Sequence, residues 1–122
     1  IGIRVTPQKL KTNIKKRLAK RLRQGMISEV KKLHRQGVNW ERLDDFGLEY
    51  RFVSRYLRAL RSNRKRMKAN NARMLKNRMV SDIEKATWRY AKRQMTWWKR
   101  DKTIKWTNNE KELTEAVRKF VA

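Results

Sequence analysis

The sequence predicts a mainly α-helical chain, a basic helical segment with one or two short edge strands. Apolar residues recur at spacings of three and four along most of its length, which is the pattern of helices with one buried face. Two β-branched segments, Ile1–Val5 and Ile104–Thr107, indicate the strands. No internal repeat or low-complexity linker interrupts the chain, so residues 1–122 are predicted to form a single unit.

The composition predicts a polyanionic partner. The chain has 122 residues, with 35 Lys and Arg against 11 Asp and Glu, and a formal net charge of +24. This excess is far larger than solubility requires and is typical of proteins that bind nucleic acid. Leu, Ile, Val and Phe together number 26 of 122 residues, enough for only a thin core. We therefore expect the chain to pack on RNA or on a further part of its own polypeptide.

Several classes of site are disfavoured. The sequence has no cysteine, so a disulfide framework, a zinc ribbon and a thiol nucleophile are excluded. The lone His34 cannot form a metal site by itself and is predicted to be a surface helix residue. No apolar run approaches the ~18 residues of a membrane span, and no signal peptide is recognisable. We expect a cytoplasmic monomer; the start at Ile1 without Met suggests truncation.

The first predicted helix starts at Thr6-Pro7, with Thr as the N-cap and Pro in the first turn. Its apolar stripe is Leu10, Ile14, Leu18 and Leu22, and Gly25 is the expected C-cap or bend. A second helix runs from about Ile27, with Ser28 near its start and with Val30 and Leu33 facing inward, and ends at Gly37.

The middle of the chain is predicted to be a loop followed by basic helices. Val38–Gly47 is rich in acids and reads as a loop or short turn. Helix resumes over Glu49–Leu60, and its buried side comprises Phe52, Val53, Tyr56, Leu57 and Leu60. Between Tyr50 and Ser81 there are eleven Arg or Lys and no acid. Ser62-Asn63 and Asn70-Asn71 are possible breaks, but interleaved apolar residues favour a basic helix that orders on RNA; these are Met67, Met74, Leu75, Met79 and Ile83.

The segment Thr87–Arg100 reads TWRYAKRQMTWWKR and is predicted to end a long helix. Five of its fourteen residues are Arg or Lys and four are Trp or Tyr. One face is expected to hold Thr87, Tyr90, Ala91, Gln94 and Trp98. Such a surface suits RNA, with charge on the backbone and rings on bases. The alternative is an amphipathic helix whose aromatic residues are core and whose basic residues are solvated.

The final helix is predicted to be capped by Asn108 after the strand Ile104–Thr107. Its predicted buried residues are Leu113, Val117, Phe120 and Val121.

Three motifs in order resemble the tRNA dimethylallyltransferase (tRNA isopentenyltransferase) family. The family's T-R-x-Y-A-K-R-Q-x-T-W run and the following h-x-W strand are matched by Tyr90, Ala91, Lys92, Arg93, Gln94, Thr96, Trp97 and Trp106. The upstream family pattern is matched by Arg17, Gly25, Glu29, Val30 and Leu33, and Phe46–Arg51 resembles its G-Y-R/K segment. The chain departs at Trp88 and Asn13, where the family usually has Arg, and the neighbouring Arg89 is the expected partial replacement for the first. It also departs by two residues inserted after Gly47 and by a longer basic stretch, Arg61 to Arg78.

The resemblance implies transfer of a dimethylallyl group from dimethylallyl diphosphate to N6 of the adenosine 3′ of the anticodon. Arg17 then matches a catalytic Arg that contacts the diphosphate, while Gly47, Leu48, Glu49, Tyr50 and Arg51 match a segment that contacts the tRNA anticodon stem-loop. Arg89, Lys92, Arg93 and Gln94 are expected near the RNA or the substrate tunnel.

For each candidate a structural alternative stays open. Arg17 also fits a solvated basic face of its helix. The segment Gly47–Arg51 also fits the start of a helix, with Tyr50 packed against its neighbours. The segment Lys92–Gln94 also fits a structural motif that holds its helix against the core.

The family's phosphate-binding loop is absent, because the four glycines stand far apart. The Asp that the resemblance implies as general base is absent as well. The resemblance therefore implies the C-terminal portion of the enzyme, inactive alone and expected to pack on a missing P-loop α/β core. No metal site is expected here, because the ligands of the enzyme's Mg²⁺ lie outside this chain. The alternative function is a stand-alone basic helical RNA-binding protein; nothing in the sequence has helix-turn-helix spacing.

Overall fold

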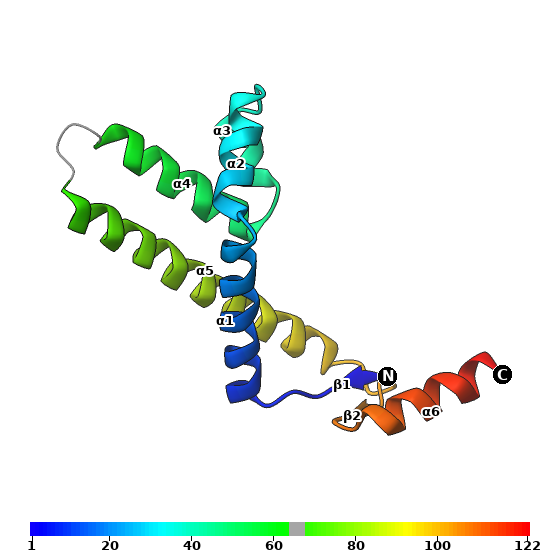
Figure 1. Ribbon diagram of the computed structural model, residues 1–122. Helices are drawn as coiled ribbons and strands as arrows, with labels where there is room; N and C mark the ends of the chain where they lie inside the picture. The colour runs from blue at the N-terminus through cyan, green and yellow to red at the C-terminus, as the bar shows by residue number, and fades with distance from the viewer. Residues whose placement is uncertain (64–67) are drawn as a thin grey trace.

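The computed structural model describes residues 1–63 and 68–122, which form helices and one small sheet (Figure 1). In chain order the elements are β1 (Gly2–Ile3), α1 (Pro7–Arg23), α2 (Met26–Arg35), α3 (Trp40–Asp45), α4 (Leu48–Ser62), α5 (Ala69–Trp98), β2 (Trp106–Thr107) and α6 (Glu110–Val121). The prediction of a mainly α chain with short strands is confirmed. No helix within the described residues is long and apolar enough to cross a membrane.

The start of α1 follows the predicted capping chemistry. The Thr6 side chain accepts a hydrogen bond from the Lys9 N–H, and Pro7 occupies the first turn. Leu18 is the buried member of the predicted apolar stripe. At the junction with α2, Gly25 has φ 92°, a left-handed conformation that glycine adopts without steric cost.

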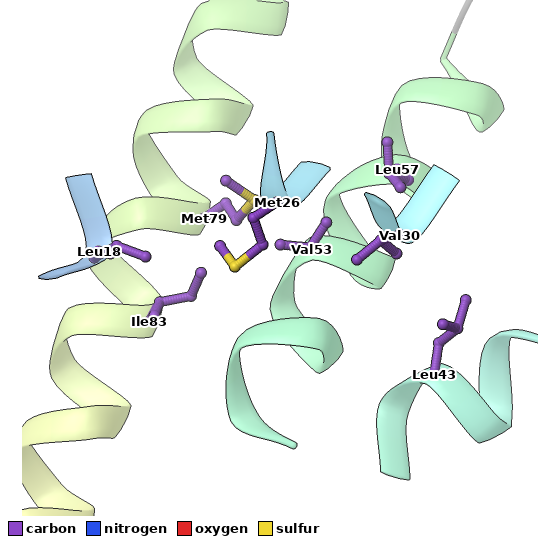
Figure 2. Packing of buried hydrophobic residues seen from close by; sticks show 8 residues of the cluster. All are labelled: Leu18, Met26, Val30, Leu43, Val53, Leu57, Met79 and Ile83. Atoms are coloured by element: carbon purple, nitrogen blue, oxygen red, sulfur yellow. The ribbon is translucent and has the colours of Figure 1, made fainter. Parts of the chain in front are cut away.

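The core lies where α1 and α2 meet the α4–α5 hairpin, and α3 closes one side (Figure 1). Figure 2 shows its eight side chains, which are Leu18, Met26, Val30, Leu43, Val53, Leu57, Met79 and Ile83. Met26 and Met79 approach each other at the centre of this view, between Leu18 and Val53. Because all eight belong to residues 18–83, the core occupies only one part of the molecule.

The predicted loop Val38–Gly47 contains a helix, α3, so that prediction was wrong. The Asn39 side chain caps it by accepting from the Arg42 N–H at 2.8 Å, and Leu43 is fully buried. His34 is not a free surface residue either. Its ring stacks on Trp40 at 3.7 Å between centroids, and its Nδ1 lies 3.0 Å from the Val38 carbonyl oxygen.

The antiparallel hairpin of α4 and α5 extends away from α1 (Figure 1). Asn63 ends α4, as predicted, whereas Asn70 and Asn71 lie inside α5 rather than at a break. Met79 and Ile83 are buried, but Met74 is exposed. Four residues of the predicted basic stretch, Arg64, Lys65, Arg66 and Met67, lie outside the described residues.

The two predicted strands pair with each other, in parallel, with Gly2 opposite Trp106 and Ile3 opposite Thr107. Their contact requires glycine, because a Cβ at Gly2 would lie 2.5 Å from the Trp106 ring. The chain thus brings residues from both its ends together beside the end of α5 (Figure 1).

The last helix is capped one residue later than predicted, by Asn109, whose side chain accepts from the Lys111 N–H. Its predicted buried face was wrong. Leu113 is half-buried, whereas Val117, Phe120 and Val121 are exposed, because α6 points away from the core (Figure 1). Residues 1–6 and 88–122, which we call the open end, contain no buried residue. Residues 7–63 and 68–87 form the core end.

Candidate nucleic-acid interface

Arg17 lies exposed in the middle of α1, beside the buried Leu18. It makes no ion pair within the described residues. Residues four apart share a helix face, so Arg17 lies on the same side as Arg21, which forms an ion pair with Glu49 in the first turn of α4. The fold therefore brings Arg17 to the side of α1 that faces the start of α4.

The segment Gly47–Arg51 forms the start of α4, and its side chains connect neighbouring helices. Gly47 has φ 132° and precedes the first turn. Glu49 pairs with Arg21 of α1, and the Tyr50 hydroxyl donates to Glu29 Oε1 of α2 at 2.5 Å. Arg51 Nε donates to the backbone carbonyl of Asp44 in α3 at 3.3 Å. The segment thus has a structural role in addition to any contact with a ligand.

The hydrogen bond to Glu29 changes the acidity of Tyr50. Because the phenol donates to a carboxylate, and because its ring is partly buried, the pKa of Tyr50 is raised above its ordinary value. The ring also packs edge-on against Phe46, with centroids 6.2 Å apart. Leu48, the remaining member of the segment, is half-buried.

Arg89, Lys92, Arg93 and Gln94 are all exposed on the last turns of α5. Arg89 and Arg93 are four residues apart and share a face, whereas Lys92 lies on the side of Trp88, with its ammonium 5.7 Å from the indole centroid. Arg89, Lys92 and Arg93 therefore fall within about 100° of the helix circumference, and Gln94 lies to one side of them. None of the four makes an ion pair within the described residues.

The aromatic residues of Thr87–Arg100 are not core. Tyr90, Trp97 and Trp98 are exposed, and the two tryptophans contact each other edge-on at 5.1 Å between centroids. Of the predicted shared face, Thr87 and Ala91 are half-buried and Gln94 is exposed. The alternative that these rings simply fill the core was wrong for the described structure.

Past α5 the chain turns on Asp101. Its Oδ1 accepts from the Thr103 N–H at 2.9 Å and from the Thr103 hydroxyl at 2.6 Å. These hydrogen bonds to the ionised form lower the pKa of Asp101. The turn directs the chain from α5 into β2.

The sequence did not predict a hollow beside these residues. It lies between the segment Arg4–Leu10, the last turns of α5 and Trp106, and it is lined by Trp88 and Lys92. Trp88, noted in the sequence only as a departure from the family pattern, is one of its lining residues.

Grouped acids suitable for a metal are lacking in the described part of the chain. Three acids around the start of α4 already have partners: Glu49 pairs with Arg21, Asp44 with Arg58, and Glu29 accepts from Tyr50. The described residues therefore do not fit a Mg²⁺ site.

Comparison with known proteins gives a consistent result. The family model described as IPP transferase matches residues 1–101. tRNA dimethylallyltransferase 2 of Citrifermentans bemidjiense is 34% identical over 122 residues, which cover 96% of this chain and 36% of that protein. The protein of the same name from Pelobacter propionicus is 42% identical over 100 residues, covering 82% and 28%. tRNA dimethylallyltransferase of Treponema pallidum is 39% identical over 99 residues, covering 81% and 28%.

No solved structure matches the chain. The chain spans about a third of the length of these relatives, between 28% and 36%. The matched residues include Arg17, the start of α4 and the basic aromatic end of α5. With a family model that covers most of its length and relatives above 30% identity, this chain belongs to the IPP transferase family.

Proposed function

We propose that the chain is the tRNA-binding part of a tRNA dimethylallyltransferase. The full-length enzyme moves a dimethylallyl group from dimethylallyl diphosphate to N6 of the adenosine 3′ of the anticodon. The observation that carries the proposal is the family match over residues 1–101, together with relatives named for this activity. The net charge of +24 supports a polyanionic substrate. The protein acts as a cytoplasmic monomer in this proposal.

Arg17 has the role of the diphosphate contact. The leaving diphosphate gains negative charge as the bond to the dimethylallyl group breaks, and a guanidinium fixed on a helix stabilises that charge. The exposure of Arg17 and its lack of an ion pair within the described residues leave its guanidinium available to a ligand.

RNA contact is assigned to the start of α4 and to the end of α5. At Gly47–Arg51 the backbone N–H groups of the first helical turn, at the positive end of the helix dipole, suit a phosphate of the anticodon stem-loop. Arg89, Lys92 and Arg93 supply positive charge, and Gln94 an amide able to donate and accept.

The open end is proposed to dock on a P-loop α/β part of the enzyme. Parallel strands occur almost entirely in larger sheets covered on both faces, yet β1 and β2 form a sheet of two strands. Ile1 and Ile3 are exposed, and so are Trp97 at the end of α5 and Phe120 of α6. The phosphate-binding loop, the general base and the Mg²⁺ ligands are assigned to that other part, and the chain alone is proposed to be inactive.

Selective RNA binding tests the proposal. At one fixed salt concentration, the chain should bind an anticodon stem-loop with an adenosine run about tenfold more tightly than an unrelated hairpin of equal length. Salt must be fixed because phosphate contacts alone make affinity strongly salt-dependent. Equal affinity for both hairpins would favour the stand-alone basic RNA-binding protein.

The role of Arg17 is tested in the full-length enzyme by Arg17→Lys, with Arg23→Lys as the matched control at the exposed end of α1. Both keep the net charge, but lysine lacks the two-pronged geometry of a guanidinium on a diphosphate. We expect Arg17→Lys to lower kcat about a hundredfold while tRNA affinity stays constant. Equal rates for both variants would place Arg17 on a solvated basic face instead.

A further inference from the structure

A hollow of about 720 Å³ lies where α1 begins, α5 ends and β2 passes. Two indole rings, Trp88 and Trp106, and three cations, Arg4, Lys92 and Lys99, belong to its lining. The volume is in the range of sites that hold small ligands. It is formed by residues 4–10 together with the end of α5 and the β2 region, which lie far from residues 4–10 in the sequence.

The hollow is positively charged. Its lining includes no acid, and within the described residues its three cations have no ion-pair partner. The first turn of α1 adds the positive end of a helix dipole through Thr6 and Pro7. An anion entering here meets several unpaired positive groups at once.

Two lysine ammonium groups lie over the ring of Trp88, which forms one wall of the hollow. The ammonium of Lys11 lies 4.8 Å from its ring centroid and that of Lys92 lies 5.7 Å away. Such cation–π contacts hold flexible lysine side chains in place. An arginine at position 88, usual in the family, would repel both ammonium groups. The departure at Trp88 therefore has a structural consequence, which is a fixed pair of lysines.

Trp106 offers an aromatic surface. Its ring lines the hollow and packs against Gly2, whose lack of a side chain lets the ring approach. Lys92 on α5 and Lys99 at its C-cap are two turns apart, roughly 10 Å along the axis. The ring suits the base of a nucleotide, and the positive charges suit its phosphates.

We propose that this hollow binds one nucleotide of single-stranded RNA, with the base on Trp106 and the flanking phosphates on Lys92, Lys99 and Arg4. Aromatic stacking and a positive groove are the usual means of holding single-stranded nucleic acid. The inference rests on the proposed function, since it assumes that the chain binds RNA. It goes beyond the RNA contacts proposed above, which include Lys92, by adding Trp106, Lys99 and Arg4 as a site for one nucleotide.

Photocrosslinking tests this site directly. The chain is irradiated with a short single-stranded RNA in which uridines are replaced by iodouridine, which crosslinks to aromatic rings in contact, and the modified peptide is identified by mass spectrometry. We expect Trp106 to be the main crosslinked residue. Crosslinks confined to the exposed Tyr90, Trp97 or Trp98 would overturn the proposal, although RNA binding itself would stand.

Charge variants show whether the lysines hold the phosphates. Lys92→Glu with Lys99→Glu is compared with Lys32→Glu with Lys85→Glu, an equal change of charge at exposed lysines that do not line the hollow. We expect the first pair to lower the crosslink yield at Trp106 about tenfold relative to the second. Equal yields from the two pairs would overturn the assignment.

Competition identifies the ligand. Dimethylallyl diphosphate has an anionic head and an apolar body, and a positively charged, aromatic hollow also suits such a molecule. It is therefore added to the crosslinking reaction as a competitor, with inorganic diphosphate as the control. We expect unlabelled RNA to suppress the Trp106 crosslink and dimethylallyl diphosphate to have no more effect than inorganic diphosphate. Selective suppression by dimethylallyl diphosphate would overturn the nucleotide assignment. Absence of RNA binding by any measure would instead refute the proposed function.

Discussion

The core end and the open end are made of similar amphipathic helices, but their apolar faces differ in what covers them. In the core end, α1, α2 and α4 cover one another and the middle of α5, and all eight buried apolar residues of the described part of the chain lie there. In the open end, α6 and the last turns of α5 expose Trp97, Trp98, Phe120 and Val121. Both ion pairs of the described residues also belong to the core end.

A single stripe of α5 crosses this boundary. Ile83, Tyr90 and Trp97 follow at seven-residue spacing and so lie on one face of the helix. Ile83 is 1% exposed, whereas Tyr90 is 53% and Trp97 63% exposed. The same face of α5 is thus buried in the core at Ile83 and is free surface at Tyr90 and Trp97. An apolar face that continues past its cover is typical of an interaction surface.

The largest expected effect contrasts two positions of this stripe. Ile83→Ala removes a buried side chain and should lower the free energy of unfolding by about 2–4 kcal/mol. Trp97→Ala removes a larger but exposed side chain and should change it by less than about 0.5 kcal/mol. Urea denaturation followed by circular dichroism measures both. A comparable loss from Trp97→Ala would mean that the open end is packed in solution.

Local signals explain how much of the fold could be predicted. The start of α1 was predicted from Thr6-Pro7 and its apolar spacing, because capping and periodicity act within a few residues. The helix α3 was missed since it has six residues and one buried side chain, Leu43, too few to show a period.

Burial was harder to predict than helicity. The sequence of α6 has the same amphipathic pattern as α1, yet Phe120 is 91% exposed. Periodicity identifies the apolar face of a helix, but a partner must be present to bury it. The hollow also escaped prediction, because it requires Arg4, Trp88 and Trp106 to meet across most of the chain.

An intermediate effect is expected from the polar contacts of the core end. Tyr50→Phe removes the hydrogen bond to Glu29 and should lower the free energy of unfolding by about 1 kcal/mol at neutral pH. Because the pKa of Tyr50 is raised in the folded state, this stabilisation is complete below the phenol's ordinary pKa. It is lost as the pH rises through the folded pKa.

The difference between the wild type and Tyr50→Phe, measured by urea denaturation at neutral and strongly alkaline pH, isolates this contribution from the titration of the lysines. We expect the difference to shrink toward zero as the pH rises. A difference in the free energy of unfolding that stays constant with pH would show that the hydroxyl does not stabilise the fold by donating its proton to Glu29.

The smallest effect is expected on α6. Phe120→Ser removes a side chain that is 91% exposed, so the free energy of unfolding of the chain should change by less than about 0.5 kcal/mol. The matched control is Leu113→Ser on the same helix, where a half-buried side chain is lost and a cost of about 1 kcal/mol is expected.

In the full-length enzyme, where we propose that the open end docks, Phe120→Ser should cost more than it does in this chain, because its ring is then covered. Equal costs in both proteins would leave Phe120 exposed in the enzyme and would assign docking to the sheet and to the end of α5 alone.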